Sequence, residues 1–106
     1  MPLVVNQRIT IGYATETLTV ANTVQVLTPS IFKDSVTSGG ATDAFITLET
    51  AEIRYYYDGT QPTSTTGHIL AVGQNLVLRG QNQMINFKCI RTGSTSGVIT
   101  VTYERD

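Results

Sequence analysis

The sequence has one cysteine, one histidine and no tryptophan. The single cysteine, Cys89, excludes an internal disulfide and is compatible with a reducing compartment. The lone histidine, His68, has no second histidine and no nearby cysteine, so it cannot form a zinc site by itself. The lack of tryptophan removes the largest aromatic stacking surface and counts against a sugar-binding site. We therefore expect no metal and no other cofactor.

Charge is also scarce, because charged residues make up 14% of the chain and the formal net charge is −1 at pH 7. The seven lysines and arginines are scattered, so nothing indicates nucleic-acid binding. Residues 1–8 lack the basic segment and long apolar segment of a secretory signal. No apolar run approaches the roughly 18 residues of a membrane span. We expect synthesis in a cytoplasm, no membrane partner, and an exposed surface built mainly from Thr, Ser, Asn and Gln, as in an assembly protein.

The abundant residues are β-branched, with 18 Thr, 10 Val and 9 Ile among 106 residues. Such residues favour strands over helices, and no helical period of useful length is present. Short alternating runs separated by turn signals predict an all-β, immunoglobulin-like sandwich of seven or eight short antiparallel strands. The length predicts one domain, which we place at residues 16–106, with residues 1–15 as an N-terminal arm or edge strand.

The expected strands follow period-two alternation of apolar residues. Proline at position 29 ends one of them, because proline cannot donate to a ladder. Residues 33–43 are expected to form a polar loop and residues 93–97 a hairpin loop. Apolar residues are expected to share one face on three strands. These sets are Ala44, Ile46 and Leu48, then Ile85, Phe87 and Cys89, and finally the inward-facing Ile99, Val101 and Tyr103. The expected strands cover residues 8–13, 17–20, 24–28, 44–50, 53–57, 68–72, 76–79, 84–91 and 98–104.

Few side chains are candidates for chemistry. His68 could act as a general base beside Asp58 or Glu49, but no nucleophile motif accompanies it, which favours a surface histidine. Cys89 lies among apolar neighbours in its strand, so core packing is favoured over a nucleophilic thiol. Glu49 and Glu52 flank a turn and are expected to be solvated. The chain is therefore expected not to be an enzyme.

Three consecutive tyrosines at positions 55–57 could form an aromatic platform for a sugar or a protein partner. On one strand Tyr55 and Tyr57 share a face and Tyr56 takes the other, so the platform holds two tyrosines at most. Core or rim packing is the favoured alternative, because a tyrosine ring buries well while its hydroxyl stays in water.

The most informative motif follows these tyrosines, where residues 53–63 read IRYYYDGTQPT. Asp58-Gly59 suits a chain reversal, because glycine adopts positive φ without steric cost and aspartate bonds its own backbone. A calcium site at Asp58 would use the hydroxyls of Thr60, Thr63 and Ser64, but calcium prefers six to eight oxygens. A structural turn is therefore the favoured interpretation.

With its later strands, this motif resembles the chitobiase/β-hexosaminidase C-terminal-type domains, which are small immunoglobulin-like sandwiches. The resemblance covers roughly residues 44–104. It implies that the Asp-Gly-Thr turn and the Pro-Thr step are structural, and that the domain is a non-catalytic carbohydrate-binding accessory module. The residues that carry it are Ile53, Tyr55, Asp58, Gly59, Thr60, Pro62, Thr63, Leu76, Leu78, Phe87, Cys89 and Ile90.

A second resemblance is to small proteins encoded among the structural genes of tailed phages. It is carried by an AFITLET–IRY–DGT–PT–GH core and a T-x-TYE ending, at residues 44–50, 53–55, 58–60, 62–63, 67–68 and 100–104, with Leu70. It implies a virion protein, specifically a capsid cement or decoration protein that bridges neighbouring capsid subunits. Its partner would be the major capsid protein or another virion protein, with a homo-oligomer as a further option. We expect the contacts to come from Leu3, Val4, Val5, Arg8, Lys33 and Asp34.

Overall fold

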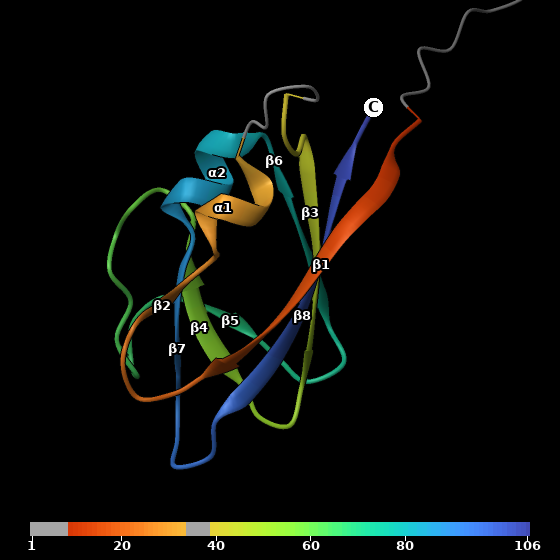
Figure 1. The fold of residues 1–106 in the computed structure, drawn as a ribbon. Helices are drawn as coiled ribbons and strands as arrows, with labels where there is room; N and C mark the ends of the chain where they lie inside the picture. Colours follow the sequence, from red (N-terminus) through yellow and green to blue (C-terminus); the bar gives the residue numbers. More distant parts are fainter. Residues whose placement is uncertain (1–8, 34–38) are drawn as a thin grey trace, which may run out of the picture.

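The computed structural model describes residues 9–33 and 39–106. These residues form strands and two short helices, and Figure 1 shows their arrangement. In chain order the elements are β1 (Ile11–Val20), β2 (Gln25–Val26), α1 (Pro29–Phe32), β3 (Asp43–Glu49), β4 (Ile53–Tyr56), β5 (His68–Leu70), β6 (Asn75–Arg79), α2 (Gln81–Asn86), β7 (Lys88–Arg91) and β8 (Gly97–Arg105).

The strands form two four-stranded antiparallel sheets that pack face to face. Sheet A has the order β1-β8-β3-β6 and sheet B the order β2-β7-β4-β5. The expected all-β sandwich is therefore confirmed. Its strand order is that of a jelly roll, in which each step along the chain changes sheet except the step from β4 to β5. In the immunoglobulin order the first two strands are neighbours, whereas here β1 and β2 lie in different sheets.

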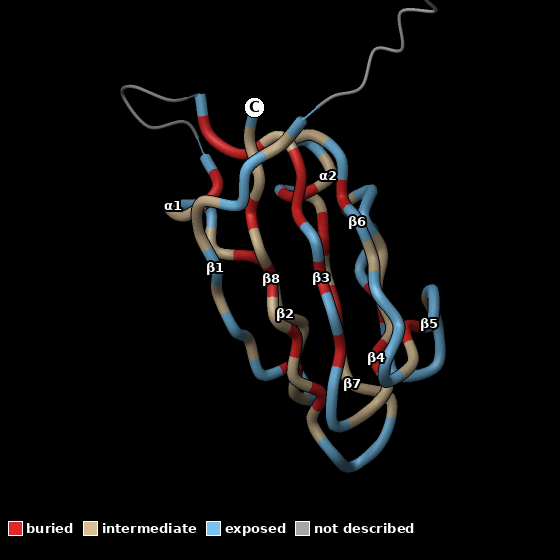
Figure 2. Tube along the Cα trace, turned by 90° about the vertical axis from the view of Figure 1, so that its right-hand side faces the viewer, coloured by how far each residue is buried: buried red, intermediate tan, exposed pale blue. Residues whose placement is uncertain are grey.

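Alternation along the strands separates a buried face from an exposed face. In β3 the side chains of Ala44, Ile46 and Leu48 are buried, and Figure 2 shows this alternation along the strand. In β8 the inward residues are Ile99 and Val101, with Tyr103 beyond them. The inward sets expected for these two strands are confirmed, because a half-buried strand must place its apolar residues at every second position.

The core fills the space between the sheets and extends under the helices. Phe32 of α1 and Met84 of α2 are both buried, so the two helices close one end of the sandwich (Figure 1). The ring of Phe32 stacks on Tyr103 with centroids 5.7 Å apart. The buried core residues are Val20, Leu27, Phe32, Ala41, Ala44, Ile46, Leu48, Ile53, Leu70, Leu78, Met84, Phe87, Cys89, Ile99, Val101 and Tyr103.

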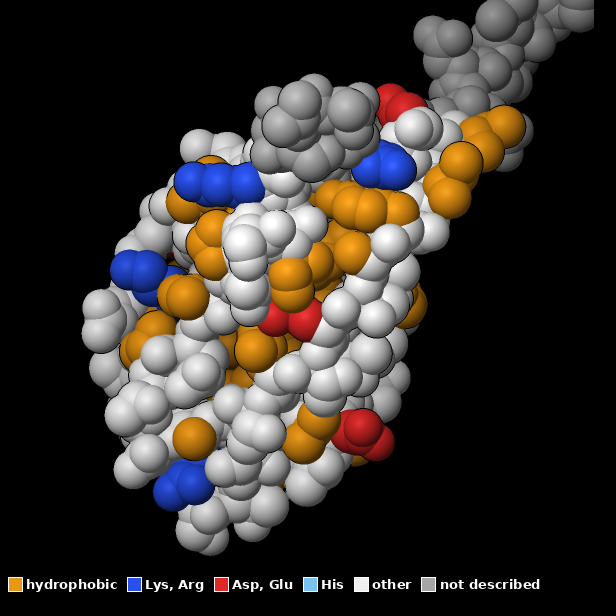
Figure 3. All heavy atoms as spheres, in the orientation of Figure 1, with side chains coloured by type: hydrophobic (Ala, Val, Ile, Leu, Met, Phe, Trp, Pro, Cys, Tyr) orange, Lys and Arg blue, Asp and Glu red, His pale blue; other side chains and the backbone are white. Residues whose placement is uncertain are grey.

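One carboxylate lies on the inner face of β1. Glu16 accepts hydrogen bonds from the hydroxyl of Thr28 at 2.7 Å, from the backbone N–H of Thr28 at 3.1 Å, and from the hydroxyl of Tyr103. Figure 3 shows an acidic side chain among hydrophobic ones between β1 and the β2–α1 segment. Burial raises the pKa of the Tyr103 phenol, and the bond to Glu16 raises it further. An inward-pointing charge on an edge strand also discourages pairing with another chain.

The expected strand over residues 84–91 is wrong in its first half. Residues 81–86 form α2, which follows Gly80 at φ +86°, and Ile85 is 48% exposed. Strand β7 covers only Lys88–Arg91, although Phe87 and Cys89 are buried as expected. The positive φ at Gly80 turns the chain out of β6, and the next residues then cover the end of the sandwich.

Three further local predictions need correction. The expected strand at residues 24–28 is reduced to Gln25–Val26, and Pro29 begins α1, where its missing N–H is not needed. Residues 93–97 do not form a hairpin, because β7 belongs to sheet B and β8 to sheet A. The two strands expected at residues 8–13 and 17–20 are one continuous strand, β1.

The N-terminal segment is described only from residue 9. Residues 11–15, which we assigned to an arm or edge strand, begin β1 at the edge of sheet A. Within residues 9–33 and 39–106, neither helix has the length or hydrophobicity to cross a membrane.

Candidate functional site

The Asp-Gly turn begins the long connection from β4 to β5. The Asp58 carboxylate accepts the backbone N–H of Thr60 at 3.0 Å, and Gly59 has φ +90°. The N–H of Gly59 donates to the carbonyl of Asn86 at 3.1 Å, which ties the turn to the end of α2. The backbone N–H of Thr60, followed by its hydroxyl, lowers the pKa of Asp58. These bonds give Asp58 and Gly59 the geometry of a structural turn.

The Pro-Thr step is also held by local contacts. Pro62 is fully buried, and the hydroxyl of Thr63 accepts the N–H of Thr66 at 3.0 Å and also bonds the Thr66 hydroxyl. These hydroxyl groups are therefore used within the loop. Within the described residues, no group of three or more His, Cys, Asp or Glu side chains is placed to hold a metal ion.

Arg54 attaches the end of this loop to sheet B. Its Nη1 donates to the carbonyl of Gly67 at 2.8 Å and its Nε donates to the carbonyl of Ser64 at 3.2 Å. Gly67 has φ +129°, and a Cβ there would lie 3.3 Å from the Cβ atoms of both Arg54 and Pro62. The DGTxPT motif and Arg54 thus form one packed unit.

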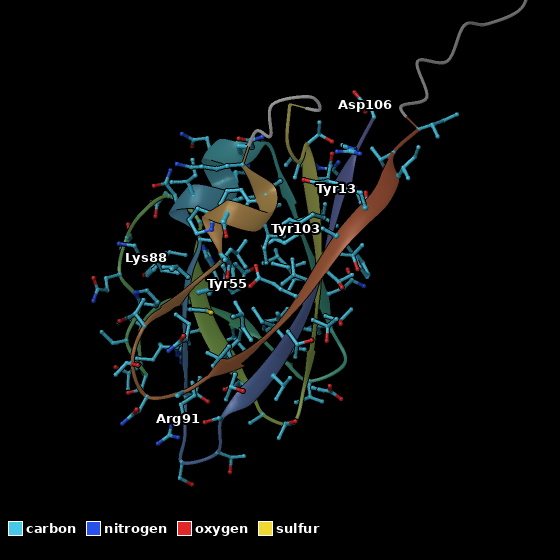
Figure 4. The ribbon with its side chains drawn as sticks, viewed as in Figure 1. Tyr13, Tyr55, Lys88, Arg91, Tyr103 and Asp106 are labelled. Atoms are coloured by element: carbon cyan, nitrogen blue, oxygen red, sulfur yellow. The ribbon has the colours of Figure 1, made fainter. Side chains whose placement is uncertain are left out.

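Aromatic rings gather where β4 ends and β5 begins. His68 pairs in register with Tyr55, and their ring centroids are 5.4 Å apart. Tyr57 stacks near His68 at 6.3 Å, and Tyr56 meets it edge-on at 5.5 Å. Tyr55, labelled in Figure 4, also contacts Phe87 at 5.8 Å, and burial followed by repulsion from Tyr57 raises its pKa. Although β4 alternates, all three tyrosines therefore reach His68.

A hollow of about 240 Å³ lies at this aromatic group. It is lined by Tyr56, Tyr57, Asp58 and His68, which we call the aromatic hollow. Tyr57 is 42% exposed, so its ring is available to a ligand. Of the two carboxylates considered as partners of His68, Asp58 lies here and Glu49 is on the other sheet. The lining offers ring faces and one carboxylate, and it includes no serine, threonine or cysteine nucleophile.

A larger groove of about 670 Å³ runs beside the Pro-Thr step. Its walls carry mainly hydroxyl and amide groups, and Arg91 supplies the one cationic side chain among its lining residues. Figure 4 places Arg91 near the end of the sandwich away from the helices. Its Nη1 donates to Ser96 at 3.2 Å, and its buried Nε has no acceptor among the described residues. The groove is lined by Asn22, Thr23, Val24, Gln61, Pro62, Thr63, Ser64, Ile90, Arg91, Thr92 and Gly93.

The outer face of sheet A is a second candidate surface, and Figure 2 looks onto it. The register places the outward residues of the sheet in rows. One row holds Glu104, Asp43 and Arg79, with Arg79 ion-paired to Asp43 at 3.6 Å. In the three rows that follow it, six residues are threonines and Glu49 is the one ionisable residue. The first of these three rows is Thr15, Thr102, Phe45 and Val77, the second is Thr17, Thr100, Thr47 and Asn75, and the third is Thr19, Val98 and Glu49. We call this surface the threonine face.

Sequence reasoning missed the threonine face, although the signal was present. Thr15, Thr17 and Thr19 alternate with Glu16 and Leu18, so they must share the face opposite the core. The inward residues of β3 and β8 were identified correctly, and the residues between them define the outer surface. The missing step was to combine the outward sets of neighbouring strands, which requires the strand order.

The remaining predicted residues fall in different places. Cys89 is buried, and burial raises the pKa of its thiol to about 12, as a core cysteine requires. Lys33 is exposed directly after α1. The other expected contact residues, Leu3, Val4, Val5, Arg8 and Asp34, lie outside the described residues.

Comparisons with family models, curated proteins and solved structures found no match for this chain.

Proposed function

We propose that this chain is a non-enzymatic structural protein of a tailed-phage particle, a capsid cement or decoration protein that bridges neighbouring capsid subunits. The observation that carries the proposal is the threonine face, a sheet surface with one ionisable residue in its three rows. The cores of protein interfaces are depleted of charged residues, because burying a charge costs free energy unless it is paired. Threonine methyl groups gain free energy on burial, and the hydroxyls can hydrogen-bond a partner's backbone, which offsets their loss of water.

The area of the face bears on how it would bind. Strands about 4.8 Å apart, with outward residues about 6.8 Å apart along each, give roughly 400 Å² for the three rows. A stable interface buries about 800 Å² on each partner. The face alone therefore supplies about half of that area. Binding to a repeated capsid lattice through further contacts, including the expected Leu3, Val4, Val5, Arg8, Lys33 and Asp34, would make up the rest.

The jelly-roll order is compatible with this role. Jelly rolls occur in viral capsid proteins and in lectins, so the fold is consistent with either kind of protein and selects neither. The resemblance to phage-encoded proteins at residues 44–50, 53–55, 58–60, 62–63, 67–68 and 100–104 is what favours the virion. The partner would be the major capsid protein or another virion protein. The chain would be synthesised in the host cytoplasm, and no binding to nucleic acid or membrane is proposed.

No catalytic group is required for this function. A protein that binds the assembled shell and not its separate subunits stabilises the shell by mass action. The stabilisation grows with the logarithm of the free protein concentration above Kd. Bridging two subunits adds contacts that exist only in the assembled state.

The proposal is tested by charging the threonine face. Purified capsids are incubated with the wild-type chain or with the Thr17→Lys/Thr100→Lys variant and sedimented. We expect wild-type protein in the pellet and at least a tenfold loss of binding for the variant, because two buried lysines would lack partners. Thr95→Lys, in the exposed loop before β8, is the matched control and should bind as wild type does. Equal sedimentation of all three proteins, or no sedimentation of any, contradicts the proposal.

The second candidate is a carbohydrate-binding accessory module. The exposed ring of Tyr57 beside the Asp58 carboxylate favours it, because sugars stack on aromatic faces and donate hydroxyls to carboxylates. The test is retention of the chain on an oligosaccharide column. If the wild-type chain is retained, the Tyr57→Ala variant is not, and the wild-type chain does not bind capsids, this proposal replaces the virion proposal.

A further inference from the structure

The walls of the aromatic hollow meet at a wide angle. Tyr56 lies at 68° to His68, with centroids 5.5 Å apart. Tyr57 is nearly parallel to His68, at 29° and 6.3 Å. Three rings from two neighbouring strands and the loop between them therefore enclose the hollow on more than one side. This corner differs from a flat platform, which presents a single ring face.

With His68 counted as neutral, the formal charge of the aromatic hollow is negative. Asp58 is fully exposed and its pKa is lowered by the Thr60 N–H, so the carboxylate is ionised at neutral pH. Neither lysine nor arginine is among the residues that line the hollow. Aromatic faces carry the negative part of the ring quadrupole, so the rings add to the attraction for a cation and an anion is disfavoured.

We propose that the aromatic hollow binds a methylated ammonium group, such as a quaternary amine. Its methyl groups would lie against the faces of Tyr56 and Tyr57, and its charge would lie near Asp58. A quaternary ammonium has no hydrogen-bond donor, so the ring faces and the one carboxylate are sufficient to hold it. The volume of about 240 Å³ lies below the ~300–1,000 Å³ of pockets that take drug-sized ligands. The hollow is therefore suited to a small head group.

A sugar fits this hollow less well. A pyranose requires several hydrogen-bond partners around one open ring face, whereas this hollow has a single carboxylate and rings that already contact one another. The proposal concerns a different surface from the threonine face, so it does not depend on capsid binding. With two or three ring contacts at a partly exposed site, we expect a Kd on the order of 1 mM.

The test is a titration of the isotope-labelled full chain with choline, followed by NMR. A parallel titration uses 3,3-dimethylbutan-1-ol, which has the shape of choline without its charge. We expect choline to shift the amides of residues 55–58 and 68 and to bind at least tenfold more tightly than the neutral alcohol. Equal affinities, or shifts confined to other residues, would overturn the proposal.

Variants locate the interaction. Tyr57→Ala should weaken choline binding at least fivefold, and Asp58→Asn should do the same while retaining an oxygen acceptor for Thr60. Glu52→Gln removes one negative charge elsewhere and is the matched control, with an expected change of less than twofold. Each variant is first checked for a wild-type amide spectrum, so a loss of binding is not a loss of fold.

Two further ligands complete the experiment. A short peptide with trimethyl-lysine distinguishes a protein side chain from a free small molecule as the source of the ammonium group. Methyl glycosides test the carbohydrate alternative at the same site. If a glycoside binds more tightly than choline, the ammonium proposal is wrong and the aromatic hollow is a sugar site.

Discussion

The hydroxyl of Tyr103 donates a hydrogen bond to the carboxylate of Glu16 inside the sandwich. Tyr103 belongs to β8 and Glu16 to the neighbouring edge strand β1. The same carboxylate accepts the hydroxyl and the backbone N–H of Thr28, just before α1. One side chain on the edge of sheet A therefore connects its own sheet to the segment that follows β2.

The first prediction concerns this carboxylate. Glu16→Ala should lower the free energy of unfolding by about 1–3 kcal/mol, because it leaves the Tyr103 and Thr28 donors without an acceptor in a partly buried site. Urea denaturation measures the change. Tyr103→Phe should also lower the free energy of unfolding. The double variant should lose less than the sum of the losses in the two single variants, since the two residues interact directly. Glu49→Gln on the outer face is the control, expected within about 0.5 kcal/mol of wild type.

The second prediction concerns the thiol of Cys89. Its pKa is about 12 in the folded protein and about 8.5–9 when unfolded. A raised pKa gives stability that is complete below the unfolded value and lost as pH rises toward the folded one. From pH 8 to pH 10 this group should lower the free energy of unfolding by about 1.4–1.9 kcal/mol. The Cys89→Ala variant should be less stable than wild type at pH 8. Its free energy of unfolding should fall less than that of wild type between pH 8 and pH 10. A thiol reagent that modifies the native chain as fast as the unfolded one would contradict this burial.

The third prediction compares Gly93, in the connection from β7 to β8, with Gly97, the first residue of β8. A Cβ at Gly97 would lie 2.6 Å from the carbonyl oxygen of Ala51 and 2.8 Å from Ile53, whereas a Cβ at Gly93 meets nothing within 4 Å. Gly97→Ala should therefore lower the melting temperature by several degrees, with a cost of about 1–3 kcal/mol from overpacking. Gly93→Ala should leave it unchanged. Similar melting temperatures for the two variants would show that the close approach at Gly97 is wrong.

The fourth prediction concerns the Asp-Gly turn. Gly59→Val places a β-branched residue at φ +90° and a Cβ 3.2 Å from Asn86, so it should destabilise the fold by about 1–3 kcal/mol. Asp58→Ala should also destabilise, because the Thr60 N–H loses its acceptor. Thermal unfolding measures both.

Acid provides an independent check on the turn. The pKa of Asp58 is lowered in the folded state, so its contribution is present above the unfolded value near 3.9 and is lost as pH falls further. An NMR titration should give a pKa for the Asp58 carboxyl that is below the ordinary value of an aspartate. A normal Asp58 pKa together with unchanged melting of both variants would contradict the structural turn.

Alternation made the buried faces of β3 and β8 predictable from the sequence. Ile46 and Val101 lie in strands with one buried and one exposed face, where a period of two is required. Residues 84–91 show the limit of this method. Their apolar residues at 85, 87 and 89 satisfy the strand pattern, but a six-residue helix that caps the core is set by tertiary fit and by Gly80.

The candidate site was predictable only in part. The Asp58-Gly59 turn follows from local backbone chemistry, so the sequence alone identifies it. The contact between Tyr56 and His68 joins residues twelve positions apart, and the threonine face joins four strands whose order no local pattern encodes. Turn residues mark where the chain bends, but they do not determine whether the next strand stays in the same sheet.

The strand order also determines when the protein can fold. Ile11 in β1 pairs with Arg105 in β8, so one pair of neighbours in sheet A joins the two ends of the described chain. Among successive strands, only β4 and β5 are neighbours in a sheet. Closing such long loops costs entropy before the contacts form, so folding on the millisecond-to-second scale is expected. A nascent chain that still lacks residues 97–106 has no partner for β1 and leaves one edge of β3 unpaired. The core therefore closes only after β8 has emerged from the ribosome.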